Sequence, residues 1–298
     1  MIILGISGLS LNLLISSYYN ASTLGAFNQV IATYIVFSML GSGGINYSVL
    51  RAVSENSMNR KELINIICGA MLPTFLISIF VSFTYVLLIG PISSLLGSIE
   101  VRSGMRLIVP GIFFFSLNKV LLSGVINGLQ RMKAFAIYQS IRYTLILIGI
   151  FTAIFYSIPG KNLPIVFSLS EMILFLFLII DISLIFNWWS ADDWINWSKA
   201  HLKYGLKCFL SGIFLELNSR IDILILGIFL SDYKVGIYSF AAFFSEGFLQ
   251  ILVVLQNNYN PILSKLISSK DLDTLLKKIK NGMRYTYFII SILGIILI

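Results

Sequence analysis

The most constraining feature of this sequence is a series of about nine apolar runs, most of them about 17 to 25 residues long. An α-helix needs that length to cross a membrane, whereas membrane strands are shorter and alternate polar with apolar residues. The sequence therefore predicts an all-α, polytopic transmembrane helical bundle. The expected spans are 1–18, 27–47, 63–89, 107–129, 135–157, 163–186, 204–230, 235–257 and 285–298, and the last is too short to be a whole span.

The composition excludes several other classes of protein. Only 11% of the residues are charged and 57% are hydrophobic, whereas soluble domains carry roughly 25% charged residues. The polar gaps of about 15 to 25 residues are too short to hold a soluble domain. The net charge of +8 comes from basic residues between the spans, not from a basic face with aromatic residues, so no nucleic-acid partner is expected.

The basic residues are distributed unequally between the two sides of the predicted bundle. Roughly fifteen lie on one side and about four on the other, which predicts that the N-terminus is cytoplasmic. The cytoplasmic group is Arg51, Arg60, Lys61, Arg131, Lys133, Arg142, Lys199, Lys203, Lys207, Lys265, Lys270, Lys277, Lys278, Lys280 and Arg284, and the other is Arg102, Arg106, Lys161 and Lys234.

A weak internal repeat suggests two parallel lobes. YNASTLGAF, from Tyr19, matches LSDYKVGIY, from Leu230: each is a short turn followed by a glycine and an aromatic residue that begins the next helix. We expect a six-helix lobe over 1–186, a cytoplasmic amphipathic connector over 187–202, and an incomplete second lobe of about three helices over 203–298. The connector carries four Trp residues, which favour the membrane surface.

Charged residues within the spans are the candidate site residues, because charge at membrane depth costs at least ~2.5 kcal/mol per residue. In FLELNSRIDILILG, from Phe214 to Gly227, Glu216 and Arg220 are four residues apart and can pair on one helix face. Asp222 lies about 200° round the helix from Arg220 and needs another partner. A structural ion pair that locks helices together is the alternative to a functional site.

Other polar residues also fall near the middle of predicted spans. Lys119, beside Asn118, is expected to be a cation of the central cavity or else a partner of Asp222 or Glu171. Glu171 and Glu246 are candidates for carrying a coupling proton, and the alternative is a hydrogen bond between helices.

Several motifs suggest no special chemistry. The glycine-rich run from Gly41 to Gly44 lacks the lysine of a phosphate loop and favours close helix packing or a kink. Cys68 and Cys208 show no metal-binding spacing, and the single histidine, His201, is expected to be solvated. We therefore expect no cofactor, no metal site and no enzyme activity.

Two segments resemble the polysaccharide-transporter branch of the multidrug/oligosaccharidyl-lipid/polysaccharide exporter superfamily, which includes O-antigen flippases. They are HLKYGLKCFLSGIFLELNSRIDILILGIFLSDYKVGIYS, from His201 to Ser239, and NYNPILSKL, from Asn258. In that branch YGLP precedes an N-x-R-I-D helix, an LG pair and a short turn into GIYS. Here Tyr204 to Leu206 keep the opening, and Lys207 replaces the proline.

The resemblance implies a two-lobed exporter of the bacterial inner membrane that acts by alternating access. Such a protein would move lipid-linked oligosaccharide, as for O-antigen or lipopolysaccharide biosynthesis, from the cytoplasmic to the periplasmic leaflet. Arg220 and Lys119 would attract the polyprenyl pyrophosphate, with Asn118, Asn218 and the acidic residues in support. Membrane lipids and other polysaccharide-assembly proteins would be partners. An ion-coupled multidrug exporter and a non-transporting membrane scaffold remain the alternatives.

Overall fold

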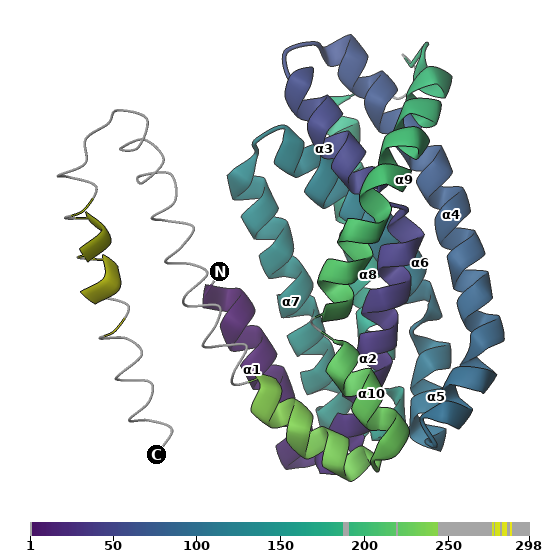
Figure 1. The fold of residues 1–298 in the computed structure, drawn as a ribbon, viewed down its shortest axis with the longest axis vertical. Coiled ribbons are helices and arrows are strands. Elements are labelled where there is room, and N and C mark those ends of the chain that lie inside the picture. The colour runs from purple at the N-terminus through teal and green to yellow at the C-terminus, as the bar shows by residue number, and fades with distance from the viewer. Residues whose placement is uncertain are drawn as a thin grey trace. The chain divides into compact units, whose positions relative to one another are not determined.

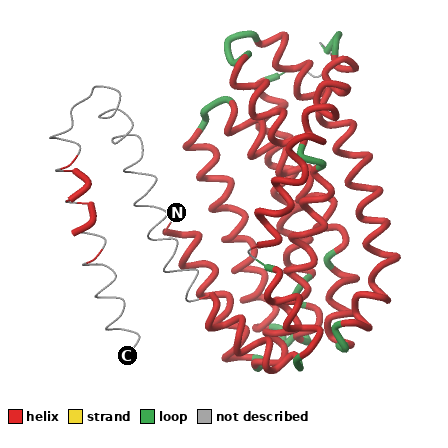
Figure 2. Tube along the Cα trace, viewed as in Figure 1, coloured by secondary structure: helices red, strands yellow, loops and turns green. Residues whose placement is uncertain are grey.

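The computed structural model describes residues 2–186, 191–218 and 220–243, together with 276, 278–280, 282–284 and 287. Ser10–Ser239 form one compact unit, and Met1–Leu9 with Phe240–Ile298 form another. Every regular element among the described residues is a helix, and short loops join these helices (Figure 2). The predicted all-α fold is confirmed.

The order of the helices is shown in Figure 1. The α-helices are α1 (Ile2–Tyr18), α2 (Ala21–Ser42), α3 (Ile45–Glu55), α4 (Arg60–Leu95), α5 (Ile99–Leu107), α6 (Val109–Lys119), α7 (Met132–Phe155), α8 (Ile165–Ile185), α9 (Trp194–Asn218) and α10 (Ile221–Phe229). A π-helix, η1 (Val120–Ile126), continues α6, and a 3-10 turn, η2 (Gly160–Asn162), precedes α8. Residues 232–243 are also helical.

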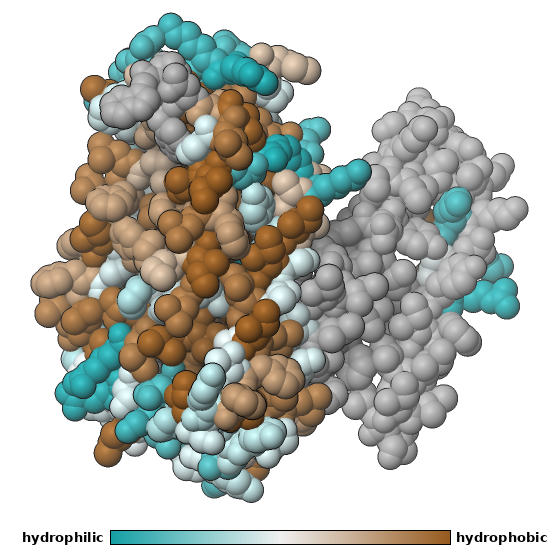
Figure 3. Space-filling view, turned by 180° about the vertical axis from the view of Figure 1, so that it is seen from behind, coloured by the Kyte–Doolittle hydropathy of each residue, from teal (hydrophilic) through white to brown (hydrophobic). Residues whose placement is uncertain are grey.

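The surface of the described helices is suited to lipid. Five helical stretches in the described part are long and apolar enough to cross a membrane: Ala21–Ser42, Arg60–Leu95, Val109–Ile126, Met132–Phe155 and Gly160–Ile185. The longest, α4, exposes Phe80, Phe83 and Leu87 by 61 to 69%. Figure 3 shows apolar residues across the middle of the described bundle and hydrophilic residues toward its ends. The chain is a multi-pass membrane protein.

Two of the predicted spans are interrupted. The span predicted over 27–47 breaks at Gly43 and Gly44, whose φ angles of 57° and 69° are left-handed and favour glycine. A Cβ on Gly44 would lie 2.5 Å from the carbonyl oxygen of Gly205 in α9, so both a kink and close helix packing occur there, as predicted. The span predicted over 204–230 divides into α9 and α10.

Among the described residues, two large clusters of buried apolar side chains lie within Ser10–Ser239, and a smaller one joins Ala32, Ile223 and Val235. One joins α3, α4, η1 and α8 and includes Ile45, Ile66 and Leu178. The other joins α2, α4, α5 and α6 and includes Tyr85 and Ile112. Because lipid is as apolar as these side chains, close packing and polar contacts between helices hold such a bundle together more than removal from water does.

The start of α9 is fastened to α4. The side-chain oxygen of Asn65 accepts hydrogen bonds from the main-chain N–H groups of Asp192 and Asp193, at 2.9 and 3.1 Å. The Trp197 indole donates to a Glu62 carboxylate oxygen at 2.7 Å. Residues 194–202, which the sequence assigned to a separate connector, are the first turns of this long helix, and 187–190 lie outside the described residues.

Candidate substrate-binding site

A buried charge network joins α6, α7 and α8. The guanidinium of Arg142 pairs with the Glu171 carboxylate through contacts of 2.8 and 3.1 Å. The Asn118 amide donates to a carboxylate oxygen and to the main-chain oxygen of Glu171, both at 2.8 Å. The three residues are 8%, 1% and 0% exposed. With a cation and an amide on its carboxylate, Glu171 holds three helices together.

Two sequence predictions are corrected here. Arg142 was counted with the cytoplasmic loops, but it lies ten residues into α7, buried and ion-paired. That pairing was missed even though residue 142 falls inside the predicted span 135–157. Glu171 was expected to partner Lys119 or else to carry a coupling proton, with a hydrogen bond between helices as the alternative. Its ion-pair partner is Arg142, and it accepts a hydrogen bond from Asn118 on α6, whereas its role in ion coupling stays a prediction.

Lys119 lies at the last position of α6, where the π-helix η1 begins. π-Helical segments are uncommon and frequently mark functional sites. The ammonium group contacts the Met39 sulfur and lines a small hollow with residues of three other helical segments. The lining residues are Met39, Ser42, Gly44, Asn46, Tyr47, Lys119, Phe209, Gly212 and Ile213. The hollow has a volume of about 10 Å³, room for about one water molecule.

The segment predicted as one helix over Phe214 to Gly227 is broken. α9 ends at Asn218, and Arg220, with a non-helical φ of −137° and ψ of −5°, caps α10. A helix end separates Glu216 from Arg220, so the predicted continuous helix is wrong. Their pairing stays a prediction, because the side chain of Glu216 lies outside the described residues. Asn218 and Ser219 have short polar side chains, a type that competes with helical hydrogen bonding. Discontinuous helices of this kind form binding sites in many transporters.

Of the other predicted site residues, the structure describes the side chains of Asp222 and Asn218. Asp222 is half-buried, and its carboxylate accepts a hydrogen bond from the Tyr238 hydroxyl at 2.6 Å. This partner comes from the next helix along the chain. Asn218 is exposed at the end of α9. The side chain of Glu216 and the whole of Glu246 lie outside the described residues.

The two repeated hairpins contact each other at their glycines. A Cβ on Gly25 would lie 1.9 Å from the main-chain oxygen of Asp232, and one on Gly236 would lie 1.8 Å from that of Ala21. The Asp232 carboxylate also accepts hydrogen bonds from Gln29, at 2.8 Å, and from Ser98. Sequence reasoning did not foresee that these two hairpins meet, and the internal repeat stays a prediction. The glycine contacts and the hydrogen bonds of Asp232 hold α2 and α5 against the turn after α10.

His201 is buried between α9, α3 and α4, contrary to the prediction that it is solvated. Its side chain is 0% exposed; Nδ1 lies 2.8 Å from the Ser48 hydroxyl and Nε2 lies 3.1 Å from the main-chain oxygen of Ile66. A carbonyl only accepts, so Nε2 carries the proton and Nδ1 accepts from Ser48. Burial lowers the pKa of His201 from 6.5 to about 4.

The low pKa of His201 predicts that acid weakens the fold. Between pH 6.5 and 4 the unfolded chain binds the His201 proton and the folded chain does not, so stability is fully present above pH 6.5 and falls as the pH is lowered. We expect the melting temperature of the purified protein in detergent to fall by several degrees between pH 7 and 5. His201→Gln should have a smaller fall, and an equal fall in both proteins would contradict this role.

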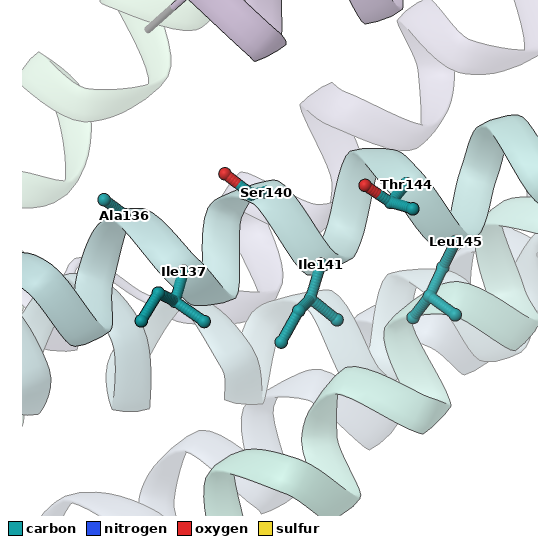
Figure 4. A pocket seen from close by; sticks show the side chains of 6 residues that line it. All are labelled: Ala136, Ile137, Ser140, Ile141, Thr144 and Leu145. Atoms are coloured by element: carbon teal, nitrogen blue, oxygen red, sulfur yellow. The ribbon is translucent and has the colours of Figure 1, made fainter.

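A larger hollow lies along α7 (Figure 4). It has a volume of about 370 Å³ and is lined by Ala136, Ile137, Ser140, Ile141, Thr144 and Leu145. The Ser140 and Thr144 hydroxyls lie along one side of the helix, and the larger apolar side chains along the other. No charged residue is among those that line it, so it offers hydroxyl groups but no cation to an anionic group. Within the described residues no cluster of metal-ligating side chains occurs.

Comparisons with known proteins agree with this architecture. No curated protein matches the chain. Among solved structures, an inward-facing multidrug resistance MATE family transporter of the MOP superfamily is similar, with a TM-score of 0.65 and 13% sequence identity over 97% of this chain and 72% of that chain. At this identity the likeness establishes the fold. A family model described as polysaccharide biosynthesis protein matches residues 15–267, and because the match covers most of the chain, this protein belongs to that family.

Proposed function

We propose that this protein moves a lipid-linked oligosaccharide from the cytoplasmic to the periplasmic leaflet of a bacterial inner membrane. Family membership supports a role in polysaccharide biosynthesis, and the fold is shared with a transporter. The repeat units of such polymers, for example O-antigen, are carried on polyprenyl pyrophosphate, so the transported headgroup is anionic. Family and fold favour a transporter over an enzyme.

The observation that carries this proposal is the position of Lys119. It lies near the middle of the Val109–Ile126 span, in a hollow that α9 covers. A cation at that depth is costly unless a partner or a function compensates for it. Arg220, at the break between α9 and α10, is the second proposed headgroup contact, because its planar guanidinium suits phosphate oxygens. The hydrogen bond between Asn118 and Glu171 holds α6 against α8 and so fixes the helix that carries Lys119.

The alternating step would separate two lobes. We place the first lobe at 1–186 and a second lobe at 203–298, with the N-terminus cytoplasmic. In this orientation the Gly25–Gly236 contact and the Asp232 hydrogen bonds close the periplasmic end. Membrane lipids surround the bundle, and other polysaccharide-assembly proteins would supply and receive the substrate. Asp222 and Glu246 remain candidates for ion coupling.

An ion-coupled multidrug exporter is the second candidate, because the similar solved structure is a multidrug resistance transporter. The two functions differ in substrate charge. The half-buried cations Lys119 and Arg220 favour an anionic substrate over a cationic drug.

Vesicles containing the purified protein should separate these functions. We expect them to move a fluorescent lipid-linked oligosaccharide between leaflets, measured as the fraction of fluorophore that an external quencher reaches over time. They should not accumulate a cationic dye across an ion gradient. Dye transport without lipid movement would favour the multidrug exporter, and neither activity in well-folded protein would favour a scaffold.

A further inference from the structure

The junction between α2 and α3 places a helix N-terminus beside the half-buried cation Lys119. α2 ends at Ser42, two left-handed glycines follow, and α3 begins at Ile45. α3 has 11 residues, and its first turn has no side-chain cap and no acidic residue. The first N–H groups of any helix lack partners within the helix, and the helix dipole makes that end attract negative charge. Phosphate groups bind at helix ends of this kind.

A second observation in the same place, an unpartnered buried amide, points to a ligand. Asn46, in the first turn of α3, lines the hollow that holds Lys119. It is 4% exposed, and its side-chain oxygen has no hydrogen-bond partner. Buried polar atoms are nearly always hydrogen-bonded, so an exception calls for an explanation. The two ends of an amide can exchange places, so Asn46 can present its NH2 group to the hollow as a donor.

The hollow therefore gathers groups that complement an oxyanion. The start of α3 offers the main-chain N–H groups of Ile45 and Asn46, whereas the N–H of Tyr47 donates to the main-chain oxygen of Gly44 at 3.2 Å. Lys119 supplies positive charge, and the side chains of Asn46 and Tyr47 supply neutral hydrogen-bonding groups. No carboxylate lines it among the described residues. The sequence run Gly41 to Gly44 is thus not a phosphate loop of the usual strand-to-helix kind, but its break exposes a helix end.

We infer that the N-terminus of α3, together with Lys119 and Asn46, binds the diphosphate of the lipid-linked substrate. This inference rests on the proposed function and adds to it the main-chain and amide groups that would hold the phosphate oxygens. Charge-assisted hydrogen bonds from an ammonium and from a helix end are stronger than those between neutral groups. They fix the position of the headgroup without depending on the identity of the sugar.

α9 occludes this site in the present conformation. Phe209, Gly212 and Ile213 form one wall of the hollow, whose volume of about 10 Å³ excludes a diphosphate. The approach is close because α9 carries glycine where it crosses the junction: a Cβ on Gly212 would lie 3.1 Å from the Tyr47 ring, and one on Gly205 would lie 2.8 Å from the main-chain oxygen of Gly43. Binding requires α9 to withdraw from α2 and α3, which links headgroup binding to lobe movement.

Calorimetric titration of the purified protein tests the site. The probes are a short-chain polyprenyl diphosphate and inorganic pyrophosphate, and the variants are Lys119→Gln and Asn46→Asp. Both variants should weaken binding of the lipid probe by about tenfold or more, because one removes positive charge and the other adds negative charge. Lys119→Arg should bind like the wild type. Lys133→Gln, which removes an exposed lysine at the start of α7, is the matched control and should also bind normally.

The possible results test the diphosphate site and the proposed transport function independently. Weakened binding of both probes, or of the lipid probe alone, supports the inference. Unchanged binding of the lipid probe in both variants, or weakened binding of inorganic pyrophosphate alone, overturns it. If the vesicles move lipid-linked saccharide while both variants bind normally, the site is wrong and the proposed function stands. If binding depends on Lys119 but no lipid moves, the site stands and the function is wrong. Monodispersity of each variant shows whether it folds. If Asn46→Asp does not fold, Lys119→Gln still tests the site.

Discussion

Arg142→Ala is expected to destabilise the protein by about 3–5 kcal/mol, because it leaves the buried carboxylate of Glu171 without its cation. Arg142 and Glu171 are 10% and 1% exposed in their side chains and 2.8 Å apart. The loss should appear as a large fall in melting temperature in detergent and in the yield of monodisperse protein. The matched control is Arg51→Ala, which removes the cation of the exposed Arg51–Glu55 pair, also at 2.8 Å, and should change the melting temperature little.

A double variant tests whether the stability lost in Arg142→Ala comes from leaving one buried charge unpaired. Arg142→Leu with Glu171→Leu removes both ions at once and should recover most of the stability lost in Arg142→Ala. Asn118 keeps its hydrogen bond to the main-chain oxygen of residue 171. A double variant no more stable than Arg142→Ala would show that the cost does not come from the unpaired carboxylate.

Gly25→Ala is expected to open the end of the bundle where the two hairpins meet. Its Cβ would lie 1.9 Å from a main-chain oxygen of residue 232, which cannot move aside as a flexible side chain can. With Cys68 and Cys208 replaced by serine, a cysteine introduced at the buried Val235 reports the opening through its reaction with a polar maleimide. Overpacking typically costs about 1–3 kcal/mol, so labelling should be about tenfold faster or more in Gly25→Ala.

Gly90→Ala is the control for this substitution. Gly90 is also a helical glycine, but a Cβ there would meet nothing within 4 Å. Labelling at residue 235 should therefore stay at the wild-type rate. If Gly25→Ala also labels at that rate, the contact between the hairpins does not close this end of the bundle.

The sequence predicted the helical fold because long apolar runs have few alternatives in a membrane. It also predicted the kink at Gly43 and Gly44, since glycine spacing there is a local property. It did not predict that Arg142 and Glu171, on different helices, meet in the interior. Such pairs depend on how the helices rotate and pack, which apolar composition does not determine. For the same reason His201 was wrongly assigned to solvent.

The candidate site was predicted in part. Lys119 stood out because a lysine is costly near the middle of a span. Asn46 was missed because two features of the fold make it a candidate. The break at Gly43 and Gly44 places it in the first turn of α3, and α9, about 160 residues away in the chain, covers it. Arg220 was found, but its surroundings were wrong because the polar residues before it end α9. Charge at membrane depth can be recognised from sequence, whereas its partners require the fold.

The most direct test of the proposed function is the rate of lipid movement in vesicles that contain equal amounts of folded wild type, Lys119→Ala, Arg220→Ala or Lys133→Ala. If Lys119 and Arg220 receive the anionic headgroup, wild type and Lys133→Ala will move fluorescent lipid-linked oligosaccharide at similar rates. Lys119→Ala and Arg220→Ala will then move it far more slowly at the same melting temperature. Equal rates in all four proteins, or a rate for the wild type no higher than in protein-free vesicles, would contradict the account.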